Sequence, residues 1–196
     1  MDKELKFQEE SIYKKLHLTL SETKKLIISA FPGEKSIQKW ADLGCGNGLF
    51  ANALSEFLKE GSKIFAIDKD SQIIQPVNSK VEIKFMRNNF ENGIAGIENL
   101  DGILMANSLH YVQNKEKLIQ NLLQHLKPDG KFIIIEYDTK NANPWIPFPV
   151  DFDGLKQLFA VFGYNEIKIA GERRSIYGND KMFAAVIEKT KPIKNK

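Results

Sequence analysis

Hydrophobic residues follow two patterns along the chain, and these patterns predict strands and helices in alternation. Short apolar runs rich in β-branched and aromatic residues are typical of strands, whereas apolar positions three and four residues apart are typical of amphipathic helices. Predicted strands cover residues 38–43, 63–68, 81–86, 101–106, 131–137, 164–169 and 181–188. Predicted helices lie between them, around residues 49–58, 73–77, 118–126 and 155–162. This alternation predicts an α/β fold with a parallel sheet and right-handed crossovers.

The final connection is the exception to this alternation. Only a short polar segment with Gly178, Asn179 and Asp180 separates the last two predicted strands. Since a parallel crossover needs about a dozen residues or more, the seventh strand is predicted to insert antiparallel. The expected fold is therefore a doubly wound, Rossmann-like sheet of seven mostly parallel strands in three layers.

A glycine-rich turn follows the first predicted strand directly. The run from Asp42 to Gly48 reads Asp-Leu-Gly-Cys-Gly-Asn-Gly, with glycine at positions 44, 46 and 48. Glycines allow positive φ and leave no Cβ over the turn, so a ligand can approach the main chain closely. We expect the backbone amides of this turn to point at an anionic group of that ligand.

This run resembles the first motif of the class I S-adenosylmethionine-dependent methyltransferases, which has an acidic residue, an apolar residue and then Gly-x-Gly-x-Gly. A second similarity is the segment Leu-Lys-Pro-Asp-Gly-Lys-Phe at residues 126–132, which leads from a predicted helix into the fifth strand. The resemblance covers roughly residues 36–188. It implies S-adenosylmethionine as the cofactor and methyl transfer as the reaction, and the family shows the same antiparallel seventh strand.

The resemblance also implies which residues bind the methyl donor. Asp68 ends the second strand 20 residues after Gly48, where a carboxylate in doubly wound folds accepts hydrogen bonds from the ribose. After the third strand the family has an acid and an apolar residue against the adenine, but this chain has Asn89 and Phe90. An amide oxygen can still accept a hydrogen bond, although Asn89 also suits a turn. The implied donor-binding residues are Asp42, Gly44, Cys45, Gly46, Gly48, Asp68, Lys69, Asn89, Phe90 and Asn107.

His110 is the candidate catalytic residue. In the family the loop after the fourth strand faces the methyl acceptor, and His110 lies in this loop, three residues after Asn107. Methyl transfer mainly requires alignment of donor and acceptor, but a base helps when the acceptor is a hydroxyl or an acidic carbon. Histidine suits that role near neutral pH. The alternative is that His110 is a polar residue that only lines the pocket.

The acceptor is predicted to be a small molecule, with oxygen or carbon as the methylated atom. Family members that methylate planar nitrogens carry Asn-Pro-Pro-Tyr after the fourth strand, whereas here Ser108 and Leu109 follow Asn107. The proline-rich stretch 138–150 is a candidate lid. Its Trp145 and Phe148 either stack on an aromatic acceptor or anchor the loop to the core.

Two alternatives to a methyltransferase remain. The first is an NAD(P)-dependent oxidoreductase on a similar sheet, and the second is a non-catalytic module that binds S-adenosylmethionine. A dinucleotide-binding turn would usually have a third glycine where Leu49 or Phe50 stands. Tyr111 and Lys115 have the Tyr-x-x-x-Lys spacing of short-chain dehydrogenases, but Tyr111 precedes the predicted helix instead of lying on it. Both departures favour the methyl donor.

Composition excludes several other classes of protein. The 196 residues, 42% apolar and 27% charged, predict one domain at residues 36–188, with a helical cap at 1–35 and a basic disordered tail at 189–196. The net charge of +3 comes without a basic stripe, so no nucleic-acid partner is expected. A single cysteine, Cys45, and no signal peptide or membrane span predict a cytoplasmic protein, a monomer or a homodimer. No spacing of residues predicts a metal site.

Overall fold

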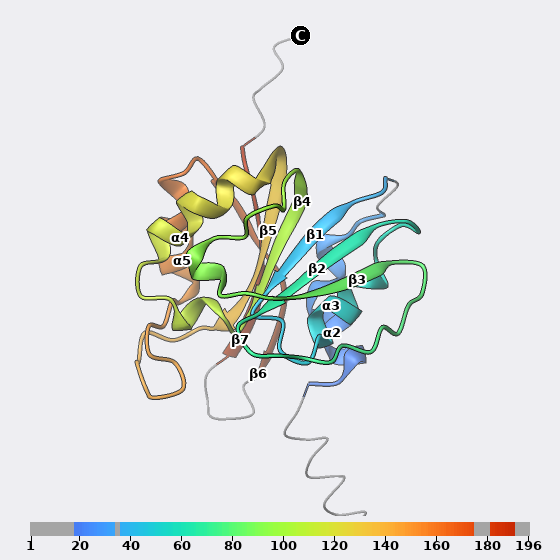
Figure 1. Cartoon of the computed structure of the whole chain (residues 1–196). Helices are drawn as coiled ribbons and strands as arrows, with labels where there is room; N and C mark the ends of the chain where they lie inside the picture. The colour runs from blue at the N-terminus through green and yellow to red at the C-terminus, as the bar shows by residue number, and fades with distance from the viewer. Residues whose placement is uncertain (1–17, 34–35, 175–180, 191–196) are drawn as a thin grey trace, which may run out of the picture.

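The fold is a seven-stranded sheet with the strand order β3-β2-β1-β4-β5-β7-β6. The computed structural model describes residues 18–33, 36–174 and 181–190 (Figure 1). The strands are β1 (Lys39–Leu43), β2 (Lys63–Asp68), β3 (Glu82–Arg87), β4 (Leu100–Ala106), β5 (Leu126–Tyr137), β6 (Glu166–Arg174) and β7 (Lys181–Glu188). The order reverses between β1 and β4, as in a doubly wound sheet, and ligands bind such sheets where it reverses.

Strand directions agree with the sequence. β1 pairs in parallel with β2 and β4, and the β2–β3 and β4–β5 pairs are also parallel. β7 pairs antiparallel with both of its neighbours, β5 and β6. The prediction of an antiparallel seventh strand is therefore confirmed. The segment 175–180, which holds the short connection used for that prediction, lies outside the described residues.

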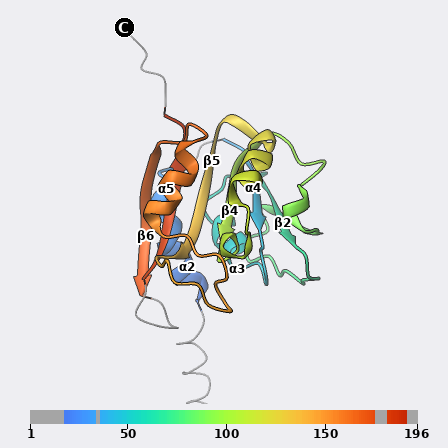
Figure 2. The ribbon, with the colours of Figure 1, turned by 90° about the vertical axis from the view of Figure 1, so that its left-hand side faces the viewer.

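Helices cover both faces of the sheet and give three layers (Figures 1 and 2). On one face lie α2 (Leu20–Ile27) and α3 (Leu49–Ser55), and on the other lie α4 (Lys115–Leu122) and α5 (Phe152–Ala160). Short 3-10 helices are η1 (Ile28–Ala30), η2 (Phe90–Asn92), η3 (Leu109–Tyr111) and η4 (Leu123–His125). Alternate residues of each strand face opposite layers. Trp40 accordingly packs with the α2 and α3 side, whereas Ala41 packs with the α4 and α5 side.

Local sequence explains where the helices begin. The side chains of Asn114 and Asp151 accept hydrogen bonds from the first-turn amides of α4 and α5. α2 begins after Thr19, whose side chain forms a capping box with Glu22. α2 packs closely against β6 at Gly171. A Cβ at this position would come within 2.5 Å of the Leu26 carbonyl oxygen, so only glycine leaves room for the helix. The rest of the predicted helical cap, residues 1–17, is not described.

The helix predicted around residues 73–77 does not form. The chain between β2 and β3 has no regular structure there, and Pro76 supplies no amide hydrogen for a helical bond. Asn52 of α3 provides the bonds that a helix would have made internally. Its amide nitrogen donates to the Gln75 carbonyl at 3.1 Å, and its amide oxygen accepts from the Val77 amide at 2.9 Å. This tertiary contact overrides the apolar spacing.

Candidate functional site

The glycine turn lies between β1 and α3, and its three glycines serve different purposes. All three have positive φ, at 75° for Gly44, 49° for Gly46 and 80° for Gly48. A Cβ on Gly44 would lie 2.5 Å from the Ser108 Cβ, and one on Gly48 would lie 2.7 Å from Ile74. A Cβ on Gly46 would meet no atom of the described residues within 4 Å. Gly46 is therefore the position at which a ligand can reach the backbone of this turn.

The backbone amides of the turn bond acceptors within the protein. The amides of Gly44 and Cys45 donate to the Ile67 carbonyl oxygen, at 2.8 Å and 3.0 Å. The Gly46 amide donates to Oδ2 of Asp68 at 2.9 Å, and the Gly48 amide donates to the Cys45 carbonyl at 2.9 Å. The expectation that these amides point at an anion of the ligand is therefore wrong. A pyrophosphate would need the donors that these bonds already use.

A buried carboxylate lies beneath this turn. Asp42 is fully buried, and neither of its oxygens has a hydrogen-bond partner. Burial raises the pKa of Asp42 to about 7, and the nearby Asp68 carboxylate adds to the rise. The Ala51 amide favours the charged form but does not reach hydrogen-bond geometry. The site therefore has two acids, Asp42 and Asp68, and the oxygens of Asp42 lack a hydrogen-bond donor.

Cys45, one of the implied donor-binding residues, lies within the glycine turn. Its side chain is buried. Burial, first of all, and then the Asp42 and Asp68 carboxylates raise the pKa of the Cys45 thiol far above its ordinary value. The thiol stays protonated, so it is not a nucleophile.

Asp68 ends β2 beside the turn and is half-buried. Its Oδ2 accepts from Gly46, and its Oδ1 accepts from the Asp70 amide at 3.0 Å. A carboxylate has about four acceptor positions, so Asp68 keeps capacity for the two hydroxyls of a ribose. The next residue, Lys69, is exposed, and its carbonyl accepts from Arg87 Nε at 3.1 Å.

Asn89 and Phe90 follow β3 at the same edge. The Asn89 side-chain oxygen accepts from the Glu91 amide at 3.1 Å and caps η2. Asn89 therefore has the turn role that was the alternative to adenine binding. Its amide oxygen has a second lone pair, so this oxygen can still accept a hydrogen bond from the adenine. Phe90 packs over the glycine turn, since its Cε1 lies 3.6 Å from the position of a Cβ on Gly44.

Asn107 follows β4 in the left-handed conformation, with φ of 52°. Such a φ is uncommon for a residue with a side chain. Its side-chain oxygen is buried and has no hydrogen-bond partner. The next residue, Ser108, donates its hydroxyl to the Leu43 carbonyl at 2.7 Å and so ties the β4 loop to the end of β1. Asn107 thus places a second orphaned acceptor at this edge of the sheet.

His110 forms a buried pair with Glu136, a residue that sequence reasoning missed. The His110 Nδ1 lies 2.6 Å from Oε2 of Glu136, and the His110 backbone amide donates to Oε1 at 3.1 Å. The side chains are 3% and 1% exposed. With Glu136 ionised, Nδ1 carries the hydrogen and Nε2 is left as the acceptor. The signal for Glu136 was a single acid at the end of the apolar run 132–135.

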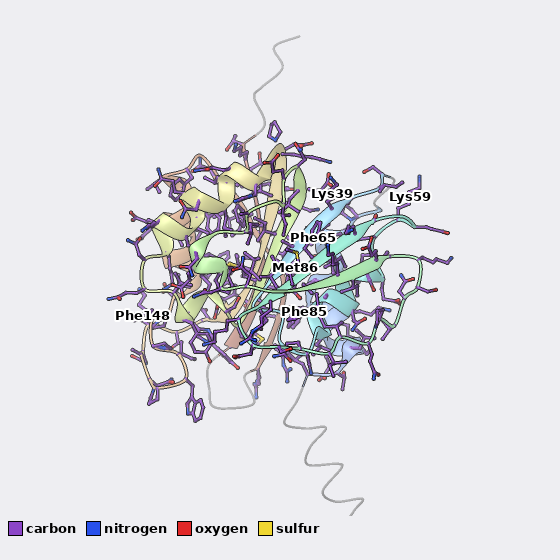
Figure 3. The ribbon with its side chains drawn as sticks, viewed as in Figure 1. Lys39, Lys59, Phe65, Phe85, Met86 and Phe148 are labelled. Atoms are coloured by element: carbon purple, nitrogen blue, oxygen red, sulfur yellow. The ribbon has the colours of Figure 1, made fainter. Side chains whose placement is uncertain are left out.

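Loop 138–150 borders this pair and is irregular, as its prolines predicted. Trp145 is 79% exposed, so it does not anchor the loop to the core. Phe148 connects the loop to the site through its backbone amide, which donates to the His110 carbonyl at 2.9 Å. Figure 3 shows Phe148 on the left-hand side, away from Lys39 at the start of β1.

Parallel pairing explains why these residues lie together. The carboxyl ends of parallel strands meet at one edge of a sheet, so the segments after β1, β2, β3 and β4 converge there with the end of β5. Among the described residues, no group of three or more His, Cys, Asp or Glu side chains is placed to hold a metal ion. His125 bonds the Ile97 carbonyl at 2.6 Å, which is a structural role.

Comparison with known proteins identifies the family. A family profile described as "Methyltransferase domain" matches residues 10–167, which is most of the chain. This chain belongs to the class I S-adenosylmethionine-dependent methyltransferases. This methyltransferase also has no helix, within its described residues, that is long and apolar enough to cross a membrane.

Curated relatives of this methyltransferase act on different atoms. The ubiquinone/menaquinone biosynthesis C-methyltransferase UbiE of Haemophilus ducreyi is 23% identical over 146 residues, which cover 71% of this chain and 52% of the relative. The ubiquinone biosynthesis O-methyltransferase of Rickettsia typhi is 31% identical over 106 residues, 52% of this chain and 42% of the relative. The chain thus spans about half the length of these relatives.

A solved structure of similar fold is the 1,6-didemethyltoxoflavin-N1-methyltransferase of Burkholderia thailandensis, in complex with 1,6-didemethyltoxoflavin and S-adenosylhomocysteine. The TM-score is 0.65 at 14% identity, over 94% of this chain and 84% of the other. At this identity the similarity concerns the fold. It agrees with the three-layer sheet of the methyltransferase.

The site of the methyltransferase fits the methyl donor. The methionine part of the donor carries an ammonium group with three hydrogens to donate, and the sulfonium is cationic. Asp42 and Asn107 each offer a buried oxygen that lacks a donor. Gly46 leaves open space beside them on the turn. Orphaned buried acceptors are rare in folded proteins, because each costs free energy unless a ligand or water satisfies it.

We expect Gly46→Val to weaken donor binding by more than tenfold, because its side chain would fill the space over the turn. The fold should survive, since a Cβ there meets no described atom, although a β-branched residue at φ 49° adds strain of about 1–3 kcal/mol. Calorimetry with S-adenosylhomocysteine measures the affinity. Gly33→Val is the control, because Gly33 also has positive φ and open space but precedes β1. Unchanged affinity in Gly46→Val would place the donor elsewhere.

Proposed function

We propose that this methyltransferase transfers a methyl group from S-adenosylmethionine to a small-molecule acceptor, with oxygen or carbon as the favoured atom. The observation that carries the proposal is the edge at which two orphaned acceptors, Asp42 and Asn107, lie near the His110–Glu136 pair. The oxygens of Asp42 and Asn107 suit a cationic group of the methyl donor. The histidine of the pair suits the removal of a proton from the methyl acceptor.

Each donor-binding residue has a separate role in this proposal. The turn at Gly46 lies against the methionine part, and Asp42 and Asn107 neutralise and bond its ammonium group. Asp68 accepts hydrogen bonds from the ribose hydroxyls with the positions left free by its own backbone partners. Phe90 and Asn89 border the adenine, where a half-buried ring provides an apolar surface.

The bound cofactor would supply an electrophilic methyl group: the acceptor would attack the methyl carbon, and the carbon–sulfur bond would break so that S-adenosylhomocysteine leaves as a neutral thioether. The protein holds the acceptor in line and excludes water. His110 takes the proton of the acceptor at Nε2, and Glu136 keeps the other hydrogen on Nδ1 and stabilises the imidazolium that forms. A base of this kind is useful for a hydroxyl or a carbon acid. An acceptor that is already a strong nucleophile does not need it.

The alternatives explain fewer of the observations. An NAD(P)-dependent oxidoreductase would use the glycine turn for a pyrophosphate, but the amides of Gly44, Cys45, Gly46 and Gly48 bond internal oxygens. A non-catalytic module that binds the donor gives no reason for a buried histidine–carboxylate pair beside the donor edge. The names of the relatives, a C- and an O-methyltransferase, agree with carbon or oxygen as the acceptor atom.

The remaining proposals concern the setting of the enzyme. We infer a cytoplasmic monomer or homodimer without a nucleic-acid partner, on the composition and charge of the chain. The proposed domain covers residues 36–188, between a cap at 1–35 and a basic tail at 189–196. Of these two flanking segments the structure describes residues 18–33, which hold α2 and η1, and residues 189–190.

The test is calorimetry of the wild type with S-adenosylmethionine and with NADH, and of Asp68→Ala with the donor. We expect binding of the donor only, and a loss of about 2–3 kcal/mol in Asp68→Ala, because two charge-assisted hydrogen bonds disappear. A 2′,3′-dideoxy donor should bind mutant and wild type almost alike. Asp70→Ala is the control, since Asp70 is exposed and only its amide contacts Asp68. A mutant that still prefers the hydroxylated donor as strongly would exclude Asp68 as the ribose ligand.

A further inference from the structure

Lys115 is the first residue of α4, a position at which a lysine is unfavourable. The helix N-terminus carries a partial positive charge, so cations are usually found at the other end. The Lys115 Nζ donates to the carbonyl of Val112 at 2.9 Å and to the carbonyl of Phe148 at 2.7 Å. The same ammonium lies 5.8 Å from the centre of the Phe148 ring. Lys115 therefore turns onto loop 138–150 instead of extending into solvent.

Phe148 is the point at which this loop is fastened. Its amide donates to the His110 carbonyl, and its carbonyl accepts from Lys115. The chain just before it is a tight turn, in which the Asn143 side-chain oxygen accepts from the amides of Trp145 and Ile146, at 2.9 Å and 3.0 Å. Residues 143–149 therefore form a compact segment that Phe148 attaches to the rest of the protein. Trp145 is exposed at the tip of this segment.

Lys115 is half-buried against this loop. Burial lowers the pKa of Lys115 below its ordinary value, and attraction to Glu136 opposes this shift. The carbonyls of Val112 and Phe148 accept hydrogen bonds from the ammonium, so they offset part of the free energy that its burial costs.

We propose that Lys115 is a positioning residue, which fastens residues 143–149 beside the acceptor site. The link to turnover rests on the proposed function, which places the methyl acceptor at this edge. The effect on the loop does not depend on it, because the contacts of Lys115 exist without donor or acceptor. A lysine with a merely structural role would change stability but not the motion of the loop.

The experiment compares the wild type with Lys115→Met and Lys117→Met. Lys115→Met keeps an unbranched side chain and removes the ammonium that donates to the loop. Lys117→Met is the matched control, since Lys117 is exposed on the same helix.

The motion of the loop is measured by time-resolved fluorescence anisotropy of tryptophan. Trp40 is fully buried in the sheet, so a fast component reports Trp145. We expect Lys115→Met to increase the amplitude of this component at least twofold, and kcat/KM for an identified acceptor to fall about tenfold, with affinity for S-adenosylhomocysteine within twofold of wild type. Lys117→Met should match the wild type.

The proposal is overturned if Lys115→Met leaves the loop anisotropy unchanged. It is supported if the anisotropy changes in Lys115→Met and not in Lys117→Met. The anisotropy measurement needs no acceptor. A wild type that fails to bind S-adenosylmethionine would therefore refute the proposed function without affecting this result.

Discussion

The donor-free protein is expected to lose stability as the pH rises from about 4 to about 7, because Asp42 must ionise without a partner. Its pKa of about 7 in the folded protein lies above the ordinary value of 3.8. Between these values the folded state holds a proton that the unfolded state has released, so the free energy of unfolding falls with pH. About three pH units at 1.36 kcal/mol each give a loss of roughly 4 kcal/mol at most. This is a large share of the 5–15 kcal/mol typical of a domain.

The measurement compares urea unfolding of the wild type and Asp42→Asn from pH 4 to pH 8. The difference between the two isolates Asp42, since other carboxylates titrate in both proteins. We expect Asp42→Asn to gain stability relative to the wild type as the pH rises, while the exposed control Asp129→Asn follows the wild type. A constant difference between Asp42→Asn and wild type over this range would show that Asp42 does not titrate there.

Donor binding supplies a second measurement of the same group. An ammonium bound beside Asp42 stabilises the ionised carboxylate, so binding and deprotonation are linked. The affinity for S-adenosylhomocysteine should therefore fall as the pH decreases below about 7, by up to tenfold per pH unit. In Asp42→Asn the affinity should be weaker and nearly independent of pH.

Loss of the His110–Glu136 pair is expected to lower turnover by roughly 10²–10⁴-fold and to leave donor affinity near the wild-type value. His110→Ala removes the proposed base. Glu136→Gln keeps the shape, but its amide group can donate to Nδ1, which would move the ring hydrogen to Nε2 and block proton removal there.

Both variants need a control for folding, because His110→Ala leaves a buried Glu136 without its partner. Calorimetry with S-adenosylhomocysteine shows whether the donor site is intact in each. His125→Asn is the matched control, since His125 bonds a backbone carbonyl and does not contact the pair. Full turnover and a wild-type pH profile in Glu136→Gln, with an identified acceptor, would reduce His110 to a residue that lines the pocket.

Local sequence determined the elements and most of their order. The spacing of apolar residues located all seven strands, because periodicity depends on neighbours in the chain. The short last connection determined the direction of β7, since chain length limits what a crossover can span. The run from Asp42 to Gly48 identified the family through its resemblance to the first motif, because residue types and their spacing are read directly from the local sequence.

Tertiary structure decided what the sequence left open or predicted wrongly. The helix expected around residues 73–77 is absent, because Asn52 on another element bonds this backbone. The amides of the glycine turn bond Ile67 and Asp68, residues of the adjacent strand, which no local pattern reveals. Glu136 looked like an ordinary strand residue until the parallel pairing of β4 and β5 placed it against His110.

The chain by itself therefore determined the fold and the set of donor-binding candidates, because both depend on spacing between near neighbours. The state of those residues was decided by contacts between segments far apart in the sequence. Asp42 is orphaned because β1 is buried on both faces, and Lys115 meets Phe148 across 33 residues. Burial and long-range pairing set charge and hydrogen bonding, and only the packed structure fixes them.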